Sequence, residues 1–187
     1  MKKLKLWAVV FAVIVFSVIC IRACNSELQP EHHEIQIPSF SLQAEIPVCE
    51  AVTVKYVVDG DTLAVADDSG KTYKVRLIGC NTPESVSPDE SKNCEEGIVA
   101  SQYTKSLLSK GDLVYLEYDQ ERFDKYERVL AYVWLSKPTK KADVDYIKQN
   151  MLNAKLLADG QAQCMFVGKN TKYQTEFLMI ENNTVRN

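Results

Sequence analysis

Short β-rich segments separated by turn residues constrain the fold of this chain more than any other feature of its sequence. Runs rich in Val, Thr, Tyr and Leu occupy residues 52–58, 61–66 and 72–78. The stretches between them, 59–60 and 67–70, contain Asp and Gly, which favour tight turns. Strand-forming runs broken by such turns are typical of neighbouring antiparallel strands. The sequence therefore predicts a β-meander in this region.

The remainder of the domain alternates between helix and strand patterns. Apolar residues recur at helical spacing from Ile98 to Leu108, and Gly111 is a suitable C-terminal cap. The further expected elements are two strands at 113–118 and 129–135 and two helices at 146–159 and 172–181. Five short strands with a helix between the third and the fourth predict an α+β fold. We expect a five-stranded β-barrel of the oligonucleotide-binding (OB) type with about three helices packed outside.

Length and composition favour one globular domain with additional segments at its ends. The 187 residues are 25% charged and 46% hydrophobic, a balance found in globular proteins. We expect the folded domain at 48–181, a polar linker at 25–47 and a short tail at 182–187. The formal net charge of -3 gives no support to strong non-specific binding of nucleic acid, although an enzyme needs only a local cationic site.

The first 24 residues have the pattern of an export segment. A basic start at 1–5 is followed by an apolar run at 6–21, just shorter than a segment that spans a bilayer unaided. A signal peptide and an uncleaved N-terminal membrane anchor both remain open. Cys24 follows Ile-Arg-Ala, an imperfect lipoprotein cleavage sequence, so lipidation at Cys24 is a third possibility. We expect the protein to be exported, either secreted or anchored to the outer side of the cytoplasmic membrane.

Six cysteines are present, and four of them, Cys49, Cys80, Cys94 and Cys164, fall within the predicted domain. In an exported protein an even set of cysteines indicates disulfides before metal ligands, and no CxxC spacing favours zinc. Four cysteines allow three pairings. Our prediction is Cys80 with Cys94 and Cys49 with Cys164. The alternative is four free, buried thiols.

Three segments carry charged residues to the ends of predicted strands. They are Asp-Gly-Asp-Thr at 59–62, the segment 75–84 with an arginine inside an apolar strand, and the charged turn 121–132. Each is weak evidence by itself, because acidic turns and solvated hairpins are common. The arginine at position 76 is the exception, since a charge in an apolar strand must find an anion or reach water.

Taken together, these segments resemble the active-site motifs of the staphylococcal nuclease (thermonuclease) family. The matching sequences are DGDT, RLIGxNTPE and DKYxRxLAY, in the order in which the family has them. The resemblance extends from about residue 52 to residue 169. It implies the OB-type barrel already predicted and a hydrolase that cuts nucleic acid.

The resemblance also implies a calcium site. Asp61 would be a direct ligand, and Asn81 and the backbone carbonyl of Thr82 would complete the protein ligands. Asp59 would lie behind them without binding the ion directly. Calcium takes oxygen ligands in flexible geometry, which suits carboxylate, amide and carbonyl groups.

The catalytic roles follow from the same motifs. Glu84 would act as the general base on the attacking water, and Arg76 and Arg128 would hold the phosphate and stabilise charge in the transition state. Lys125 and Tyr126 match positions that contact a terminal phosphate in the family.

Three differences from the best-known family member affect the site. Asn81 stands where that member has Asp, which removes a negative charge and should lower calcium affinity, so that millimolar free calcium is needed. Glu127 replaces a Gly and places an acidic group beside the predicted phosphate clamp. Two nucleotide-stacking tyrosines fall near Phe166 and Gly168, so at most one stacking position remains.

The function expected from this resemblance is a calcium-dependent endonuclease that hydrolyses DNA and RNA with little sequence selectivity, acting as a monomer. One alternative is a nucleic-acid-binding module of the same barrel type, weak or inactive as an enzyme, at the cell envelope. A second is a purely structural domain, which would be favoured if Arg76 and Arg128 were paired internally with carboxylates.

Overall fold

The computed structural model describes residues 46–86 and 89–184. The predicted export segment, the possible lipidation at Cys24 and almost all of the predicted linker lie outside the described residues. Within the part that is described, no helix is both long and apolar enough to cross a membrane.

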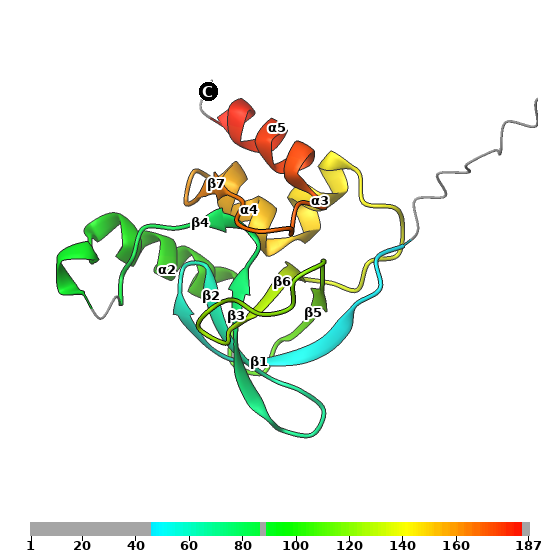
Figure 1. The fold of residues 1–187 in the computed structure, drawn as a ribbon, viewed down its shortest axis with the longest axis horizontal. Coiled ribbons are helices and arrows are strands. Elements are labelled where there is room, and N and C mark those ends of the chain that lie inside the picture. Colours follow the sequence, from blue (N-terminus) through cyan, green and yellow to red (C-terminus); the bar gives the residue numbers. More distant parts are fainter. Residues whose placement is uncertain (1–45, 87–88, 185–187) are drawn as a thin grey trace, which may run out of the picture. The chain divides into compact units, whose positions relative to one another are not determined.

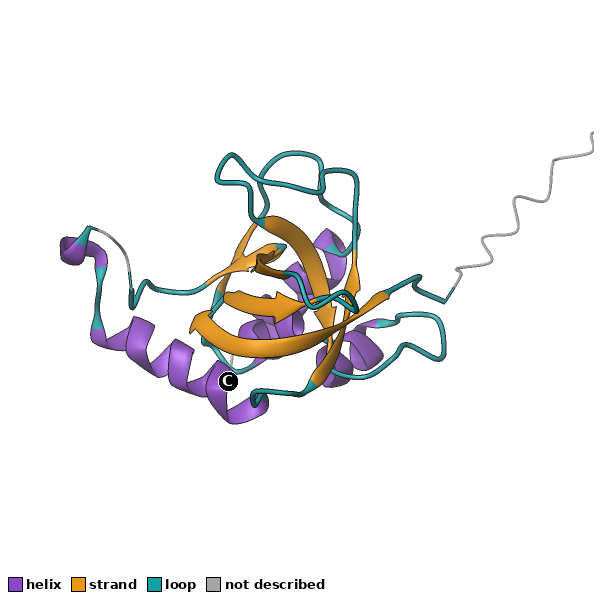
Figure 2. Ribbon diagram, turned by 90° about the horizontal axis from the view of Figure 1, so that it is seen from below, coloured by secondary structure: helices purple, strands orange, loops and turns teal. Residues whose placement is uncertain are grey.

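Five strands form a closed barrel, as predicted (Figure 2). They are β1 (Glu50–Asp59), β2 (Thr62–Ala66), β3 (Thr72–Leu77), β5 (Leu113–Glu117) and β6 (Val129–Trp134). Their order around the barrel is β1-β2-β3-β6-β5. All neighbours are antiparallel except β3 and β6, which run parallel and bring the strand that contains Arg76 beside the strand that follows Arg128. The predicted meander at the start of the domain is confirmed.

Two short strands outside the barrel were not predicted from the sequence. They are β4 (Gly79–Asn81) and β7 (Gln163–Met165), which form a separate antiparallel two-stranded sheet. Three-residue strands are too short to show a periodic pattern, and their pairing joins segments far apart in the chain. This sheet matters for the site because Asn81 lies in β4.

Four α-helices and a short 3₁₀ helix are present in the described ranges. They are η1 (Glu90–Lys92), α2 (Glu95–Leu107), α3 (Val144–Asn150), α4 (Leu152–Ala158) and α5 (Gln174–Thr184). Figure 1 shows α3, α4 and α5 gathered on one side of the barrel, while α2 lies apart from them.

The helix predicted at 146–159 is divided into α3 and α4. Met151 separates them with extended backbone angles, φ -112 and ψ 126, and forms an isolated β-bridge with Trp134 at the end of β6. Met151 is fully buried. A tertiary contact with the barrel therefore overrides the helical pattern at this residue.

A buried carboxylate connects the barrel to the segment before α5. Glu117 is 2% exposed, and its Oε2 accepts hydrogen bonds from Trp134 Nε1 at 2.7 Å and from the Tyr173 hydroxyl at 2.9 Å. Lys172 forms an ion pair with the same side chain. Three donors compensate the buried charge, and two of them, Lys172 and Tyr173, connect the segment before α5 to β5 of the barrel.

Asn153 in α4 connects three backbone groups next to the β3–β4 turn. Its Nδ2 donates to the carbonyl oxygens of Ile78 at 2.8 Å and Ala131 at 3.4 Å, and its Oδ1 accepts from the Val133 amide at 2.9 Å. Asn153 is fully buried. It therefore holds α4 against the barrel at the point where the chain leaves β3 for β4.

We predict that Asn153→Ala lowers the free energy of unfolding by about 3 kcal/mol, because it leaves buried backbone groups without partners. Urea denaturation of the full-length chain in detergent measures this. Asn150→Ala is the matched control, since Asn150 is partly exposed and donates to a single carbonyl, that of Tyr146. A loss at Asn153 no larger than the loss at Asn150 would contradict the assignment.

Candidate functional site

The β3–β4 segment is built around the guanidinium of Arg76. The Arg76 side chain is only 11% exposed. Its Nη1 donates to the backbone carbonyls of Leu77 and Cys80, each at 2.8 Å. Its Nη2 forms an ion pair with Asp61 Oδ2 at 3.0 Å and donates to Asn81 Oδ1 at 2.8 Å. Two predicted calcium ligands therefore converge on one nitrogen atom of Arg76.

Further contacts bring Thr82 to Asp61. Asp61 Oδ2 accepts from the backbone amide of Thr82 at 2.9 Å, and Asp61 Oδ1 accepts from the Thr62 hydroxyl at 3.0 Å. The Thr82 side chain packs against Gly60, where a Cβ atom would lie 2.8 Å from Thr82 Oγ1. The turn between the two aspartates thus needs Gly because a larger residue would displace Thr82. Asp61, Asn81 and Thr82 are brought together as the sequence predicted.

The oxygen atoms collected here fit a hard divalent cation such as calcium. Asp61 offers a carboxylate and Asn81 an amide oxygen, but Asp61 Oδ2 and Asn81 Oδ1 are both engaged by Arg76 in this structure, so a cation would compete with the guanidinium for them. Thr82 Oγ1 is buried and has no hydrogen-bond partner among the described residues. Within 46–86 and 89–184, no group of three or more His, Cys, Asp or Glu side chains could hold a metal ion. A cation at this site would therefore depend on amide and backbone oxygens beside Asp61.

Asp59 has a different position from Asp61. Its Oδ1 accepts from the Ser85 hydroxyl at 2.7 Å and from the Gly60 amide at 2.8 Å, and its Oδ2 accepts from the Ser85 amide at 3.3 Å. These bonds attach the β1–β2 turn to the residue after Glu84. The sequence analysis did not identify Ser85, whose role depends on a contact between distant segments.

The carboxyl of Glu84 interacts electrostatically with both aspartates. Partial desolvation raises the pKa of its carboxyl, and repulsion from Asp59 and Asp61 raises it further, while Arg76 acts in the opposite direction. A carboxylate with a raised pKa is a stronger base than one with the ordinary pKa, and the exposed side chain of Glu84 is open to water. The position and the environment of Glu84 are therefore compatible with the predicted role of general base.

Helix α2 supports Glu84 through its first turn. The Cys94 amide donates to the Glu84 carbonyl at 3.1 Å. At Gly97 an added Cβ atom would lie 2.2 Å from that same carbonyl oxygen, so only Gly permits this contact. Gly97 was not identified from the sequence, because a helical pattern does not show which distant backbone segment lies against a Gly.

Arg128 is held by a local ion pair. Its Nε lies 2.7 Å from Asp124 Oδ2, and Asp124 Oδ1 accepts the backbone amides of Tyr126 and Arg128 at 2.8 and 3.0 Å. Partial burial alone would raise the pKa of Asp124, but the hydrogen bonds from Arg128 and Tyr126 lower it below its ordinary value. Since Asp124 engages Nε, the terminal nitrogens of Arg128 have no hydrogen-bond partner among the described residues.

Lys125 and Tyr126 lie in the same loop, and both are exposed. The Tyr126 ring is 66% exposed, with Lys125 Nζ at 5.0 Å and Arg128 Cζ at 5.5 Å from its centroid. The aromatic ring thus lies within a group of cationic side chains.

Phe166, one of the predicted candidates for stacking, is used in packing instead. It is only partly exposed, its ring lies 6.0 Å from Phe177 of α5, and a Cβ at Gly79 would come within 2.7 Å of it. Gly168, at the other stacking position, has no side chain. Among the described residues near this loop, the exposed aromatic side chains are Tyr126 and Phe123, at 66% and 61%.

Glu127 adopts a conformation that disfavours any residue except Gly. Its φ is 61, and it is the one non-glycine residue with positive φ in the described ranges. The side chain is exposed. The replacement of Gly by Glu thus has a backbone cost as well as a change in charge.

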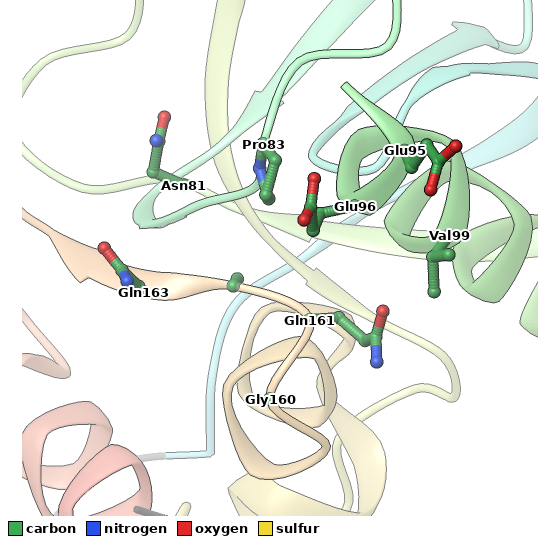
Figure 3. A pocket seen from close by; sticks show the side chains of 9 residues that line it. Asn81, Pro83, Glu95, Glu96, Val99, Gly160, Gln161 and Gln163 are labelled. Carbon is green, nitrogen blue, oxygen red and sulfur yellow. The ribbon is translucent and has the colours of Figure 1, made fainter. Parts of the chain in front are cut away.

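A cavity of about 610 Å³ lies beside Asn81 (Figure 3). Pro83, side chains from the start of α2 and the segment after α4 complete its lining; they include Glu95, Glu96, Gln161 and Gln163. Neither Arg76 nor Arg128 lines it. Because its charged groups are acidic, this cavity is unsuited to phosphate. Asn81 lines it and also contacts Arg76, so the cavity borders the cluster around Arg76.

The predicted disulfides are absent from the structure. Cys49, Cys80, Cys94 and Cys164 are all free thiols. The sulfur of Cys94 lies 3.9 Å from the Glu84 carbonyl, and that of Cys49 lies 3.7 Å from the Pro47 carbonyl. The strand partner of Cys80 is Cys164, in neither predicted pair, because β4 pairs with β7. Burial raises the pKa of the Cys80 thiol and that of the Cys164 thiol, the latter to about 12.

Comparison of the sequence with known proteins finds a family match and several relatives. A family model described as "Staphylococcal nuclease homologue" matches residues 74–186, more than half of the chain. Thermonuclease of Staphylococcus intermedius is 42% identical over 125 residues, 67% of this chain and 66% of that protein. Thermonuclease of Staphylococcus hyicus is 42% identical over 118 residues, 63% and 61% respectively. Endonuclease YncB of Bacillus subtilis (strain 168) is 35% identical over 134 residues, 70% and 56%. The matches thus span less than two thirds of the length of these relatives.

We predict that Gly97→Ala lowers the free energy of unfolding by about 1 to 3 kcal/mol, since the new methyl group would collide with the Glu84 backbone. Helix propensity alone predicts the opposite sign. Urea denaturation measures the change. The exposed α2 residue Gln102 offers a control, because Gln102→Ala should be neutral or slightly stabilising. Equal, small effects of both substitutions would argue against the close contact.

We predict that Glu127→Gly raises the free energy of unfolding by about 1 kcal/mol, because Gly adopts positive φ without a Cβ clash. Glu127→Ala is the matched control: it removes the same charge and keeps the strain, so its stability should not rise. Thermal unfolding of both variants separates the backbone effect from the electrostatic one. A gain in both variants would assign the effect to charge.

Proposed function

The chain belongs to the staphylococcal nuclease homologue family, and from this premise we propose that it is a calcium-dependent nuclease. Its substrates are DNA and RNA, in which it hydrolyses phosphodiester bonds with little sequence selectivity. The observation that carries the proposal is the convergence of Asp61 and Asn81 on Arg76, with Glu84 held beside them.

The proposed calcium ligands are Asp61, Asn81 and the backbone carbonyl of Thr82. All three belong to segments joined by the hydrogen bonds of Asp61 and Arg76. Bound there, calcium supplies a Lewis acid for a phosphate oxygen. Asn81 contributes no charge, so we expect filling of the site to need millimolar calcium.

Glu84 is the proposed general base. Its carboxyl faces Asp59 and Asp61, which favour proton uptake, and its backbone is fixed by α2 and by the Asp59–Ser85 bonds. Proton removal from an attacking water by a positioned carboxylate contributes typically 10² to 10⁴ in rate. A fixed backbone keeps the carboxylate within hydrogen-bonding distance of the attacking water during the reaction.

Arg76 and Arg128 are the proposed phosphate ligands. The contacts of Arg76 with two backbone carbonyls orient its guanidinium, and the contact of Arg128 Nε with Asp124 leaves the terminal nitrogens directed elsewhere. A planar guanidinium can pair with two phosphate oxygens at once and stays charged at any relevant pH. Both terminal nitrogens of Arg76 are engaged by protein oxygens in this structure, so Arg76 must exchange some of these contacts to bind phosphate. Lys125 and Tyr126, in the same loop as Arg128, are proposed to contact a terminal phosphate.

The structural-domain alternative would be favoured by internal ion pairs, and both arginines do form them, Arg76 with Asp61 and Arg128 with Asp124. By this criterion the two pairs count in favour of the structural domain. Two features favour the enzyme. The Arg76 pair includes the proposed calcium ligands, and the Arg128 pair uses only one of its nitrogens.

The binding-module alternative requires a surface for nucleic acid without catalysis. The exposed Tyr126 beside Lys125 and Arg128 would serve such a surface equally well. In that alternative, the placement of Glu84 near Asp59 and Asp61 would have no function. We therefore rank the binding module second.

We further propose that the protein is exported and acts as a monomer. The N-terminal residues 1–24 would direct export and then be cleaved, remain as an anchor or carry lipid at Cys24, and residues 25–47 would connect them to the nuclease domain. Tail residues 185–187 follow the end of α5, which runs to Thr184, past the predicted helix end at residue 181.

The proposal predicts calcium-dependent cleavage of single-stranded DNA, duplex DNA and RNA by the full-length chain in detergent, abolished by chelator. Glu84→Gln should lower the rate by about 10² to 10⁴, and Arg76→Ala by about 10² to 10³. Circular dichroism confirms that each variant folds. Arg122→Ala is the control, because Arg122 is exposed and pairs with Glu50 outside the proposed site.

The alternatives have distinct outcomes in the same assay. Binding of single-stranded DNA without cleavage would favour the binding module, and neither binding nor cleavage would favour the structural domain. Cleavage that persists in Glu84→Gln would show that the base is another residue.

A further inference from the structure

Two cysteines lie opposite each other in the small β4–β7 sheet. Cys80 is the register partner of Cys164, between the neighbouring pairs Gly79 with Met165 and Asn81 with Gln163. Cys80 is 1% exposed, and Cys164 is partly buried and packs against the same hydrophobic core.

The geometry of such a pair matches that of a disulfide. Directly opposed residues of antiparallel strands place their side chains on the same face, with Cα atoms about 4.5 to 5.5 Å apart. Disulfides join Cα atoms that are about 4.4 to 6.8 Å apart. The other two cysteines of the domain lie outside this sheet, with the Cys94 sulfur near the Glu84 carbonyl and the Cys49 sulfur near the Pro47 carbonyl.

We propose that Cys80 and Cys164 form a cross-strand disulfide when the chain folds in oxidising surroundings. The two thiols lose two protons and two electrons as the S–S bond forms. A disulfide donor, either a small-molecule or a protein disulfide, accepts them and is reduced to two thiols. Because Cys80 is buried in the folded chain, the bond forms during folding, while the donor still has access to both thiols.

The bond would join the proposed catalytic site to the C-terminal part of the domain. The Cys80 carbonyl accepts a hydrogen bond from Arg76, and the next residue is Asn81. On the other strand, the Cys164 amide donates to Glu181 of α5 at 2.7 Å. A disulfide here therefore fixes β4, with the residues that contact Arg76, to β7 and α5. This inference rests on the strand register and stands whether or not the proposed nuclease activity is correct.

The test is to refold the reduced, full-length chain in detergent with oxidised and reduced glutathione. Free thiols are then alkylated and the chain is digested without reductant. Mass spectrometry should find a peptide that links Cys80 to Cys164. Reductant should lower the midpoint of thermal unfolding by an amount on the order of 10 °C, because the bond closes a long loop in the unfolded chain.

Two single substitutions make the test specific. Cys164→Ala should abolish the linked peptide and make the unfolding midpoint insensitive to reductant. Cys164 is the better choice than the fully buried Cys80, whose replacement endangers folding. Cys49→Ala is the matched control and should retain both properties. Alkylation of both Cys80 and Cys164 in the refolded chain, or links that join either one to another cysteine, would overturn the proposal.

Discussion

The ion pair between Arg76 and Asp61 is the interaction on which the candidate site depends. Both side chains are largely removed from water, at 11% and 8% exposure, so either charge alone would be costly to bury. The Asn81 amide and two backbone carbonyls complete the contacts of Arg76. The position of β4 is therefore coupled to the charge of Arg76 in β3. The same contacts hold Asp61 and Asn81, two of the ligands proposed for calcium, close together without a bound metal ion.

Around this pair, the acidic turn and α2 support each other. Asp59 binds Ser85, and α2 binds the backbone of Glu84 through the Cys94 amide. The close approach at Gly97 allows the helix to reach that carbonyl. Desolvation raises the pKa of Glu84, and repulsion from Asp59 and Asp61 raises it further. A bound cation would relieve that repulsion, and the fixed backbone would keep Glu84 in place as it did so.

The loop before β6 combines a well-ordered set of hydrogen bonds with one strained backbone position. Asp124 organises it by accepting backbone amides and the Arg128 guanidinium, while Glu127 occupies a left-handed conformation that suits Gly. The sequence shows the motif in this loop and the replacement of Gly by Glu127. The sequence analysis treats that replacement only as a change in charge. Backbone angles are properties of the folded turn, and the sequence alone did not reveal that this position needs positive φ.

The barrel followed from the sequence, because turn residues and strand-forming runs are local patterns. The residues of the candidate site came from the resemblance of three motifs to a known family, and their roles stay a prediction. The division of the helix at Met151, the roles of Ser85 and Gly97 and the partner of Cys80 did not follow from the sequence. Each of them arises where segments distant in the chain meet. Local sequence determines which residues favour a strand, a turn or a ligand, whereas contacts between distant segments exist only once the whole core has packed.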